Sequence, residues 1–123
     1  MSDQRTARAA VYSETGDADV IHTVDKPVTD PGPGEVRVRI RRSGVNPTDW
    51  KSRRGSEAGT PVDPPQTPNH DGAGVVDAVG TGVEAALHGL RVWTVEAAYQ
   101  RAEGTAQDYA LVRASNVGRR RAY

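Results

Sequence analysis

Short apolar runs alternate with polar residues along much of the chain. The clearest case is residues 35–41, where Val36, Val38 and Ile40 fall on one face of an extended segment and three arginines fall on the other. This alternation predicts a β-strand with one buried face. Three arginines on a strand face can bind an anion, but exposed arginine is common on antiparallel sheets, so a solvated face is the favoured interpretation.

Glycine and proline separate these runs, with 13 and 8 residues respectively among 123. The segment 30–34 is the most pronounced break, and residues 55–68 hold four prolines and two glycines, which predicts an irregular loop. Short apolar runs separated by glycine and proline are typical of an all-β domain with many turns. The further strands are expected at residues 8–12, 20–24, 72–79, 90–95 and 106–112.

One short helix is expected at residues 47–53. Asn46 is a favourable N-cap residue and Pro47 a favourable first helical residue. Asn46 and Trp50 are four residues apart and therefore share a helix face. Physical chemistry alone favours a capped helix with one aromatic anchor over a functional site here.

Composition narrows the possible functions. Sixteen basic and sixteen acidic residues give a formal net charge of zero, which argues against nucleic acid or an anionic membrane as a partner of the whole domain. The absence of cysteine excludes disulfides, thiolate catalysis and cysteine-based zinc or iron–sulfur sites, and is compatible with a cytoplasmic location. The longest apolar runs are too short for a membrane span, and the N-terminus lacks the apolar segment of a secretory signal.

Two motifs suggest chemistry and have simpler explanations. Residues 80–85, GTGVEA, fit the loose dinucleotide pattern G-x-G-x-x-A, but a strand follows too soon for the required helix, so a glycine turn between antiparallel strands is favoured. His70 and Asp71 are an adjacent imidazole–carboxylate pair, which can serve as an acid/base group but is more often a structural hydrogen-bonding pair. The three histidines are scattered, so no metal site is expected.

The order of the segments is more specific than any one of them. From N- to C-terminus they read RAAVY, DPGPGEVRV, GVNPTDWK, PNHDGAGVV, VGTGV and GTAQDY. This order resembles the N-terminal GroES-like domain of the medium-chain dehydrogenase/reductases, in particular their zinc-independent quinone oxidoreductase and enoyl reductase branch. The resemblance covers about residues 8–115, nearly the whole chain. The domain is therefore expected to span residues 1–115, and residues 116–123 are expected to be a frayed basic tail.

The resemblance implies a fold and a role. The fold would be a bent, partly open antiparallel β-barrel with short helices, mainly β. In the family this domain forms one wall of a cleft in which NADPH transfers a hydride to a quinone or an activated alkene. It implies catalytic roles for Asn46, Lys51 and His70, substrate contacts for Asn46 and Trp50, and a contact of Lys51 with the cofactor ribose. Asn46 stands where the zinc-dependent branch has a cysteine ligand, which agrees with a zinc-free site.

The 123 residues contain no segment able to build the family's Rossmann domain. The chain alone is therefore expected neither to bind NADPH tightly nor to be redox-active, and to need either a Rossmann-containing partner or self-association into a homo-oligomer. Whether it is an enzyme stays open at this point. The alternatives are a cofactor-free small-molecule binder, a cyclisation or isomerisation catalyst, and a structural or assembly domain.

Overall fold

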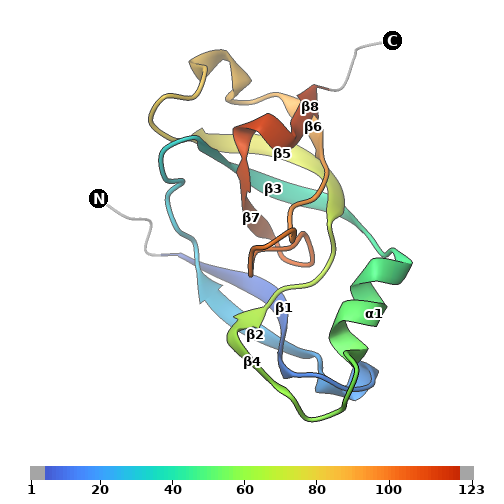
Figure 1. Cartoon of the computed structure of the whole chain (residues 1–123). Helices are drawn as coiled ribbons and strands as arrows, with labels where there is room; N and C mark the ends of the chain where they lie inside the picture. The colour runs from blue at the N-terminus through green and yellow to red at the C-terminus, as the bar shows by residue number, and fades with distance from the viewer. Residues whose placement is uncertain (1–4, 120–123) are drawn as a thin grey trace.

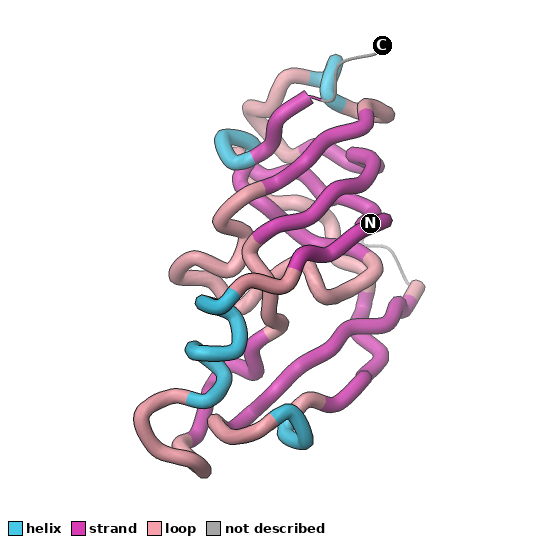
Figure 2. The backbone as a smooth tube through the Cα atoms, turned by 90° about the vertical axis from the view of Figure 1, so that its right-hand side faces the viewer, coloured by secondary structure: helices cyan, strands magenta, loops and turns pink. Residues whose placement is uncertain are grey.

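The structure is a computed structural model that describes residues 5–119. Within them it has two antiparallel sheets and a single α-helix, which lies at one side of the molecule (Figure 1). The smaller sheet has the strand order β2-β1-β4 and the larger one the order β7-β3-β5-β6-β8. The predicted mainly β fold is confirmed, and the sheets do not close into a barrel (Figure 2). The strands are β1 (Thr6–Glu14), β2 (His22–Pro27), β3 (Glu35–Gly44), β4 (Pro61–Gln66), β5 (Asp71–Val79), β6 (Arg91–Thr94), β7 (Tyr109–Arg113) and β8 (Val117–Arg119).

The core lies on one face of the larger sheet. The inward residues of β3 meet those of the neighbouring strands because directly opposed residues of paired strands point to the same face. Val38, for example, is opposite Val76 on β5 and Ala110 on β7. The buried cluster consists of Val36, Val38, Val76, Val92, Ala97, Ala110 and Val112.

The arginines of β3 do not behave alike. Arg37 is buried, and its guanidinium forms two hydrogen bonds with the Asp77 carboxylate, from Nε at 2.8 Å and from Nη2 at 3.3 Å. The expectation of a solvated face is therefore wrong at Arg37, because an ion pair across to β5 compensates its burial. Arg39 and Arg41 are exposed as expected.

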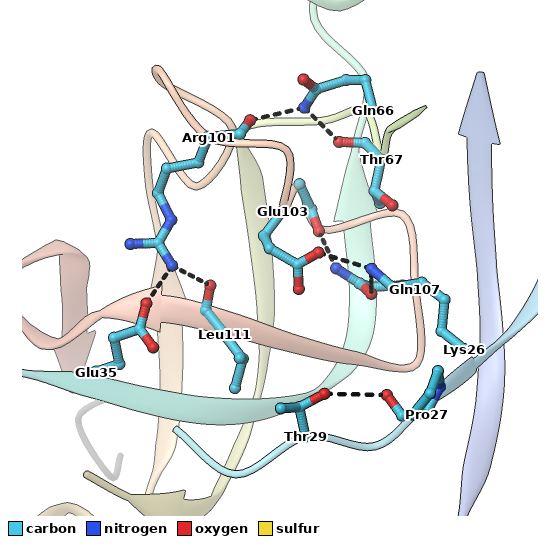
Figure 3. Close-up of polar contacts among 11 residues, drawn as sticks. Lys26, Pro27, Thr29, Glu35, Gln66, Thr67, Arg101, Glu103, Gln107 and Leu111 are labelled. Carbon is cyan, nitrogen blue, oxygen red and sulfur yellow. Dashed lines mark hydrogen bonds and ion pairs between the residues drawn. The ribbon is translucent and has the colours of Figure 1, made fainter. Parts of the chain in front are cut away.

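The loop between β6 and β7 connects the two sheets (Figure 3). On the smaller sheet, Lys26 Nζ donates to Glu103 Oε2 at 2.6 Å and to Gln107 Oε1 at 3.2 Å. On the larger sheet, Arg101 forms an ion pair with Glu35 and donates to the Leu111 carbonyl. These contacts join segments far apart in sequence, so the loop has a defined place between the sheets.

Three segments differ from what the sequence predicts. The predicted irregular loop 55–68 contains β4, since residues 61–66 pair with β1. The second strand begins at His22 because Ala18–Val20 form a 3₁₀ turn, η1. Residues 117–119 of the expected frayed tail form β8, which pairs with β6, and residues 120–123 lie outside the described part.

The dinucleotide-like motif lies in the connection between the antiparallel strands β5 and β6, as expected for a turn. After it comes a short 3₁₀ turn, η2 (Ala85–Leu87). A second 3₁₀ turn, η3 (Ala114–Asn116), leads into β8. Across residues 5–119 no helix has the length and apolar character that a membrane span requires.

Candidate functional site

The helix α1 (Pro47–Arg54) begins where β3 ends and confirms the predicted helix. Asn46 is its N-cap residue, with an extended backbone at φ −116° and ψ 160°. The backbone N–H of Asn46 donates to Asp49 Oδ2 at 2.6 Å, so the carboxylate fixes the start of the helix. Asp49 is only 6% exposed.

The side chain of Asn46 is also held. Its Nδ2 donates to Asp71 Oδ2 at 2.8 Å, and Asp71 is the first residue of β5. One N–H of the amide is therefore occupied, and the orientation of the other N–H and of the carbonyl oxygen is set by this bond. A pre-oriented amide can bind a polar group of a ligand with little loss of rotamer freedom.

His70 faces a different carboxylate from the one its sequence neighbour suggests. Its Nε2 lies 3.9 Å from Asp49 Oδ1, whereas the Asp71 carboxylate bonds Asn46. His70 therefore pairs with Asp49, and the interpretation of His70 and Asp71 as an interacting pair is wrong. The histidine side chain is 22% exposed, so it remains accessible from solvent.

Trp50 and Lys51 lie on the exposed side of α1. Trp50 is 39% exposed, and its ring has two cations near it, Lys51 Nζ at 5.7 Å and Arg54 Cζ at 5.8 Å from the centroid. Such distances are those of cation–π contacts. The structure thus brings Asn46 and His70 to one polar cluster and leaves Trp50 and Lys51 on the neighbouring solvent-facing surface.

A directional chain of hydrogen bonds supports this cluster. Asn69 Nδ2 donates to Ser43 Oγ at 2.8 Å, and the Thr105 hydroxyl donates to the Asp71 carbonyl at 2.7 Å. The Ser43 and Thr105 hydroxyl oxygens lie 2.8 Å apart. Because the Thr105 proton is used on Asp71, Ser43 must donate to Thr105. The chain holds the start of β5, and with it Asp71, in place.

Sequence reasoning missed this support. The spacing Asn46-x-x-Asp49 resembles a capping box, so Asp49 could have been found from the sequence. Ser43 and Thr105 are 62 residues apart, and no local pattern connects them.

A small cavity lies beside the cluster, with a volume of about 80 Å³. Its wall includes Tyr12, Asp49, Asn69 and His70. Burial raises the pKa of the Tyr12 hydroxyl, the Arg53 charge lowers it and the Asp49 charge raises it, with a net increase. The cavity has room for a few water molecules and is far below the roughly 300–1,000 Å³ of ordinary ligand pockets. An organic substrate bound here needs a further wall.

Exposed apolar side chains border the cluster. The backbone N–H of Ala97 donates to the His70 carbonyl at 3.0 Å, which places residues 95–99 beside the histidine. Val95 is 45% and Tyr99 53% exposed on this segment. Val45, next to Asn46, is 73% exposed. The region therefore combines oriented polar groups with apolar surface, which is the usual composition of a ligand or partner site.

Metal binding has no obvious place in this arrangement. No three His, Cys, Asp or Glu side chains within residues 5–119 are grouped so that they could hold an ion.

Comparison with known proteins agrees with this geometry. Residues 32–120 match the alcohol dehydrogenase GroES-like domain. An alcohol dehydrogenase of a Moraxella species is 41% identical over 85 residues, which cover 69% of this chain and 24% of the relative. The quinone oxidoreductase of Lama guanicoe is 38% identical over 92 residues, which cover 74% of this chain and 28% of the relative.

A solved structure shows the same fold. A mycobacterial protein complexed with NADPH superposes with a TM-score of 0.78 at 30% identity, over 93% of this chain and 34% of the mycobacterial chain. The chain thus spans between a quarter and a third of the length of these proteins. The matching segments include both the start of α1 and the start of β5. The chain belongs to the alcohol dehydrogenase GroES-like domain family.

Proposed function

We propose that this chain provides the substrate-side wall of an NADPH-dependent reductase of quinones or activated alkenes. The observation that supports it most directly is the Asn46 amide, held by Asp71 at 2.8 Å beside His70 and bordered by exposed apolar residues. The quinone oxidoreductase relative and the NADPH-bound mycobacterial neighbour favour this chemistry over other uses of the same fold. A cytoplasmic location is part of the proposal.

Each side chain has a distinct task in this proposal. The second N–H of the Asn46 side-chain amide binds the carbonyl oxygen of the substrate, and the exposed ring of Trp50 packs against the flat apolar part of the substrate. Lys51 brings an ammonium group that neutralises negative charge on a cofactor ribose-phosphate or on the substrate oxygen. His70 holds a proton that can be transferred to that oxygen.

The described residues fit only part of a dinucleotide site. NADPH, when bound, supplies the hydride that reduces the substrate. Its pyrophosphate is ordinarily held by several free backbone N–H groups at a helix N-terminus. At α1, Pro47 has no N–H and the N–H of Asn46 is bonded to Asp49. Lys51 can contact the cofactor, and a Rossmann-containing segment or partner must bind most of it.

The test is a fusion protein. Joining this chain to the dinucleotide-binding part of the Lama guanicoe quinone oxidoreductase should give NADPH-dependent quinone reduction. Asn46→Ala and Lys51→Met should each lower kcat/KM by about tenfold or more, because each removes one polar contact to a charged or polar group. Arg8→Gln, an exposed cation on β1, is the matched control and should retain the parent value.

Two results would contradict the proposal in different ways. A folded fusion without activity, beside an active intact relative in the same assay, would reject the reductase function. An active fusion in which Asn46→Ala and Lys51→Met keep full kcat/KM per folded molecule would retain the function and reject these residues as its site.

A further inference from the structure

The face of the larger sheet opposite the valine core carries a group of exposed arginines on adjacent strands. Arg39 on β3 is opposite Val75 on β5, which is opposite Arg91 on β6. Directly opposed residues of paired strands share a face, so Arg39 and Arg91 lie on the same side, two strand spacings or about 10 Å apart.

Two more arginines lie on this face, Arg41 by the alternation and Arg42 because of a β-bulge. The register between β3 and β5 shifts between Ile40 and Arg42, and Arg41 is the extra residue. Ile40 packs against the core. Arg41 and Arg42 are both exposed and, with Arg91, line one groove. Arg39 lies beside this hollow, opposite Val75. We refer to the hollow lined by Arg41, Arg42 and Arg91, together with Arg39 beside it, as the arginine groove.

These cations differ from four others in the protein. Lys26, Arg37, Arg101 and Arg119 each form a salt bridge with a carboxylate. Over residues 5–119, none of the four groove arginines has a carboxylate partner, and Arg42 Nη1 donates instead to the Arg41 carbonyl at 3.1 Å. The chain has zero net charge, so this is a local excess of positive charge. Like charges this close repel one another, and an anion between them would remove that cost.

The groove has the size of a small-molecule site. Its volume is about 420 Å³, and its floor is formed by Ala73, Gly74 and Val75. These small side chains leave the space above the strand open and contain no acidic group. The guanidinium groups at the rim present planar pairs of donors that match the oxygens of phosphate.

We propose that the arginine groove binds a condensed phosphate, either inorganic or as the oligophosphate end of a nucleotide. Several negative charges within about 10 Å match the spacing of Arg39 and Arg91. An acidic peptide fits less well. The strands β3, β5 and β6 are each already paired on both sides, so a peptide cannot add as another strand, and the floor has no deep apolar pocket for an anchoring side chain.

Calorimetric titration of the 123-residue chain with sodium triphosphate tests the proposal. Saturable one-to-one binding is expected, and it should weaken as sodium chloride is raised. Arg41→Gln combined with Arg91→Gln should lower the affinity by about tenfold or more. Two matched controls are Arg54→Gln and the pair Arg54→Gln with Arg53→Gln, which remove cations from α1 and should change the affinity by no more than about twofold.

A second measurement locates the ligand without relying on the variants. Backbone amide shifts on addition of triphosphate should be largest at Ala73, Gly74 and neighbouring residues of β5. Titration with ATP distinguishes the two sources: equal affinity identifies the phosphates as the whole ligand, and tighter binding identifies a nucleotide.

Four results would overturn the proposal. The first is no saturable binding at millimolar triphosphate, and the second is an equal loss of affinity in the α1 control pair. The third is amide shifts spread over the whole surface. The fourth is displacement of triphosphate by polyglutamate at a lower concentration of negative charges than triphosphate itself supplies. The last would assign the groove to an acidic protein segment instead.

Discussion

At the scale of single residues, the decisive contacts are side chains that satisfy one another across long stretches of sequence. Asn46 and Asp71 are 25 residues apart and joined at 2.8 Å. Glu35 and Arg101 are 66 residues apart and form an ion pair. Both pairs are only partly exposed, so each contributes more than a fully exposed surface pair would.

The bond between Asn46 and Asp71 should be visible in a double-mutant cycle. Asn46→Ala and Asp71→Ala are each expected to lower the free energy of unfolding by about 1–2 kcal/mol, since each leaves a polar partner unsatisfied. The double variant should lose less than the sum, with a coupling of about 1 kcal/mol. Urea denaturation measures all three, and strictly additive losses would show that the bond contributes nothing to stability.

Glu35 should make stability depend on acidity. Burial raises the pKa of this carboxyl, but hydrogen bonds from Arg101 and from the Gly32 N–H, with the charges of Arg101 and Arg113, lower it further, so its net pKa is depressed. A depressed folded-state pKa stabilises the protein above the ordinary carboxyl value of about 4.3, and this stabilisation is lost as pH falls through the folded pKa.

The variant Glu35→Gln isolates this contribution. At neutral pH it should be less stable than the parent by about 1–2 kcal/mol, and the difference should shrink as pH falls from about 5 toward 3. Thermal unfolding across this range is the measurement. Glu57→Gln, at an exposed carboxyl in the loop after α1, is the control, and a constant difference for Glu35→Gln at every pH would contradict the assignment.

At the scale of elements, the larger sheet depends on a close approach between the backbones of β3 and β5. Gly74 on β5 lies against β3, where an added Cβ would come within 2.0 Å of the Arg39 carbonyl oxygen. A backbone atom cannot move aside without shifting the strand. The glycine therefore permits a close approach of the two strands beside the bulge at Arg41.

Gly74→Ala should destabilise the sheet by about 3 kcal/mol, because the clash is with backbone. Gly44→Ala is the matched control on the same strand pair. Its Cβ would meet atoms of Asp71 no closer than 3.6 Å, so a change within about 0.5 kcal/mol is expected. Chemical denaturation compares the two, and an equal effect at both positions would refute the role of close approach.

At the scale of the whole molecule, the chain presents polar groups and apolar surface without enclosing a substrate. The cavity beside His70 is about 80 Å³, while Val45, Val95 and Tyr99 are exposed. Clustered exposed apolar residues favour association with another protein surface. A chain with this exposed surface and no enclosed substrate site is expected to self-associate and to bind the cofactor poorly by itself.

The protein should associate with itself at high concentration. Val95→Ser with Tyr99→Ser should shift the equilibrium toward monomer, since it removes apolar area from the exposed segment. Sedimentation velocity over a concentration series is the measurement. Thr81→Ser with Val62→Ser alters residues outside this segment and is the control; a parent chain that stays monomeric throughout would contradict the prediction.

The chain alone should not bind NADPH with submicromolar affinity. The start of α1 offers few free N–H groups to a pyrophosphate, because Pro47 has none and the backbone N–H groups of Asn46 and Asp49 are already bonded. Titration followed by NADPH fluorescence tests this. Tight binding would show that the cofactor site is assembled between copies of this chain.

Much of this architecture was readable from local pattern. Alternation in residues 35–41 predicted β3 because period-two apolar spacing buries one face of a strand. Asn46 followed by Pro47 predicted α1 because capping and a fixed φ act within one turn. The order of the segments predicted the family, which the match over residues 32–120 confirms. The site roles of Asn46, Trp50, Lys51 and His70 stay predictions until the fusion protein is tested.

What the sequence determined by itself was therefore the set of effects that act within a few residues: most of the strands, although not β4 or β8, and the start of the helix. Only the tertiary structure decided that Arg37 is buried against Asp77 and that a bulge leaves Arg42 exposed beside Arg41. It also decided that His70 faces Asp49 and that Asp71 orients Asn46. These outcomes depend on register and on partners about 20 to 40 residues away, where burial and ion pairing override the local alternation.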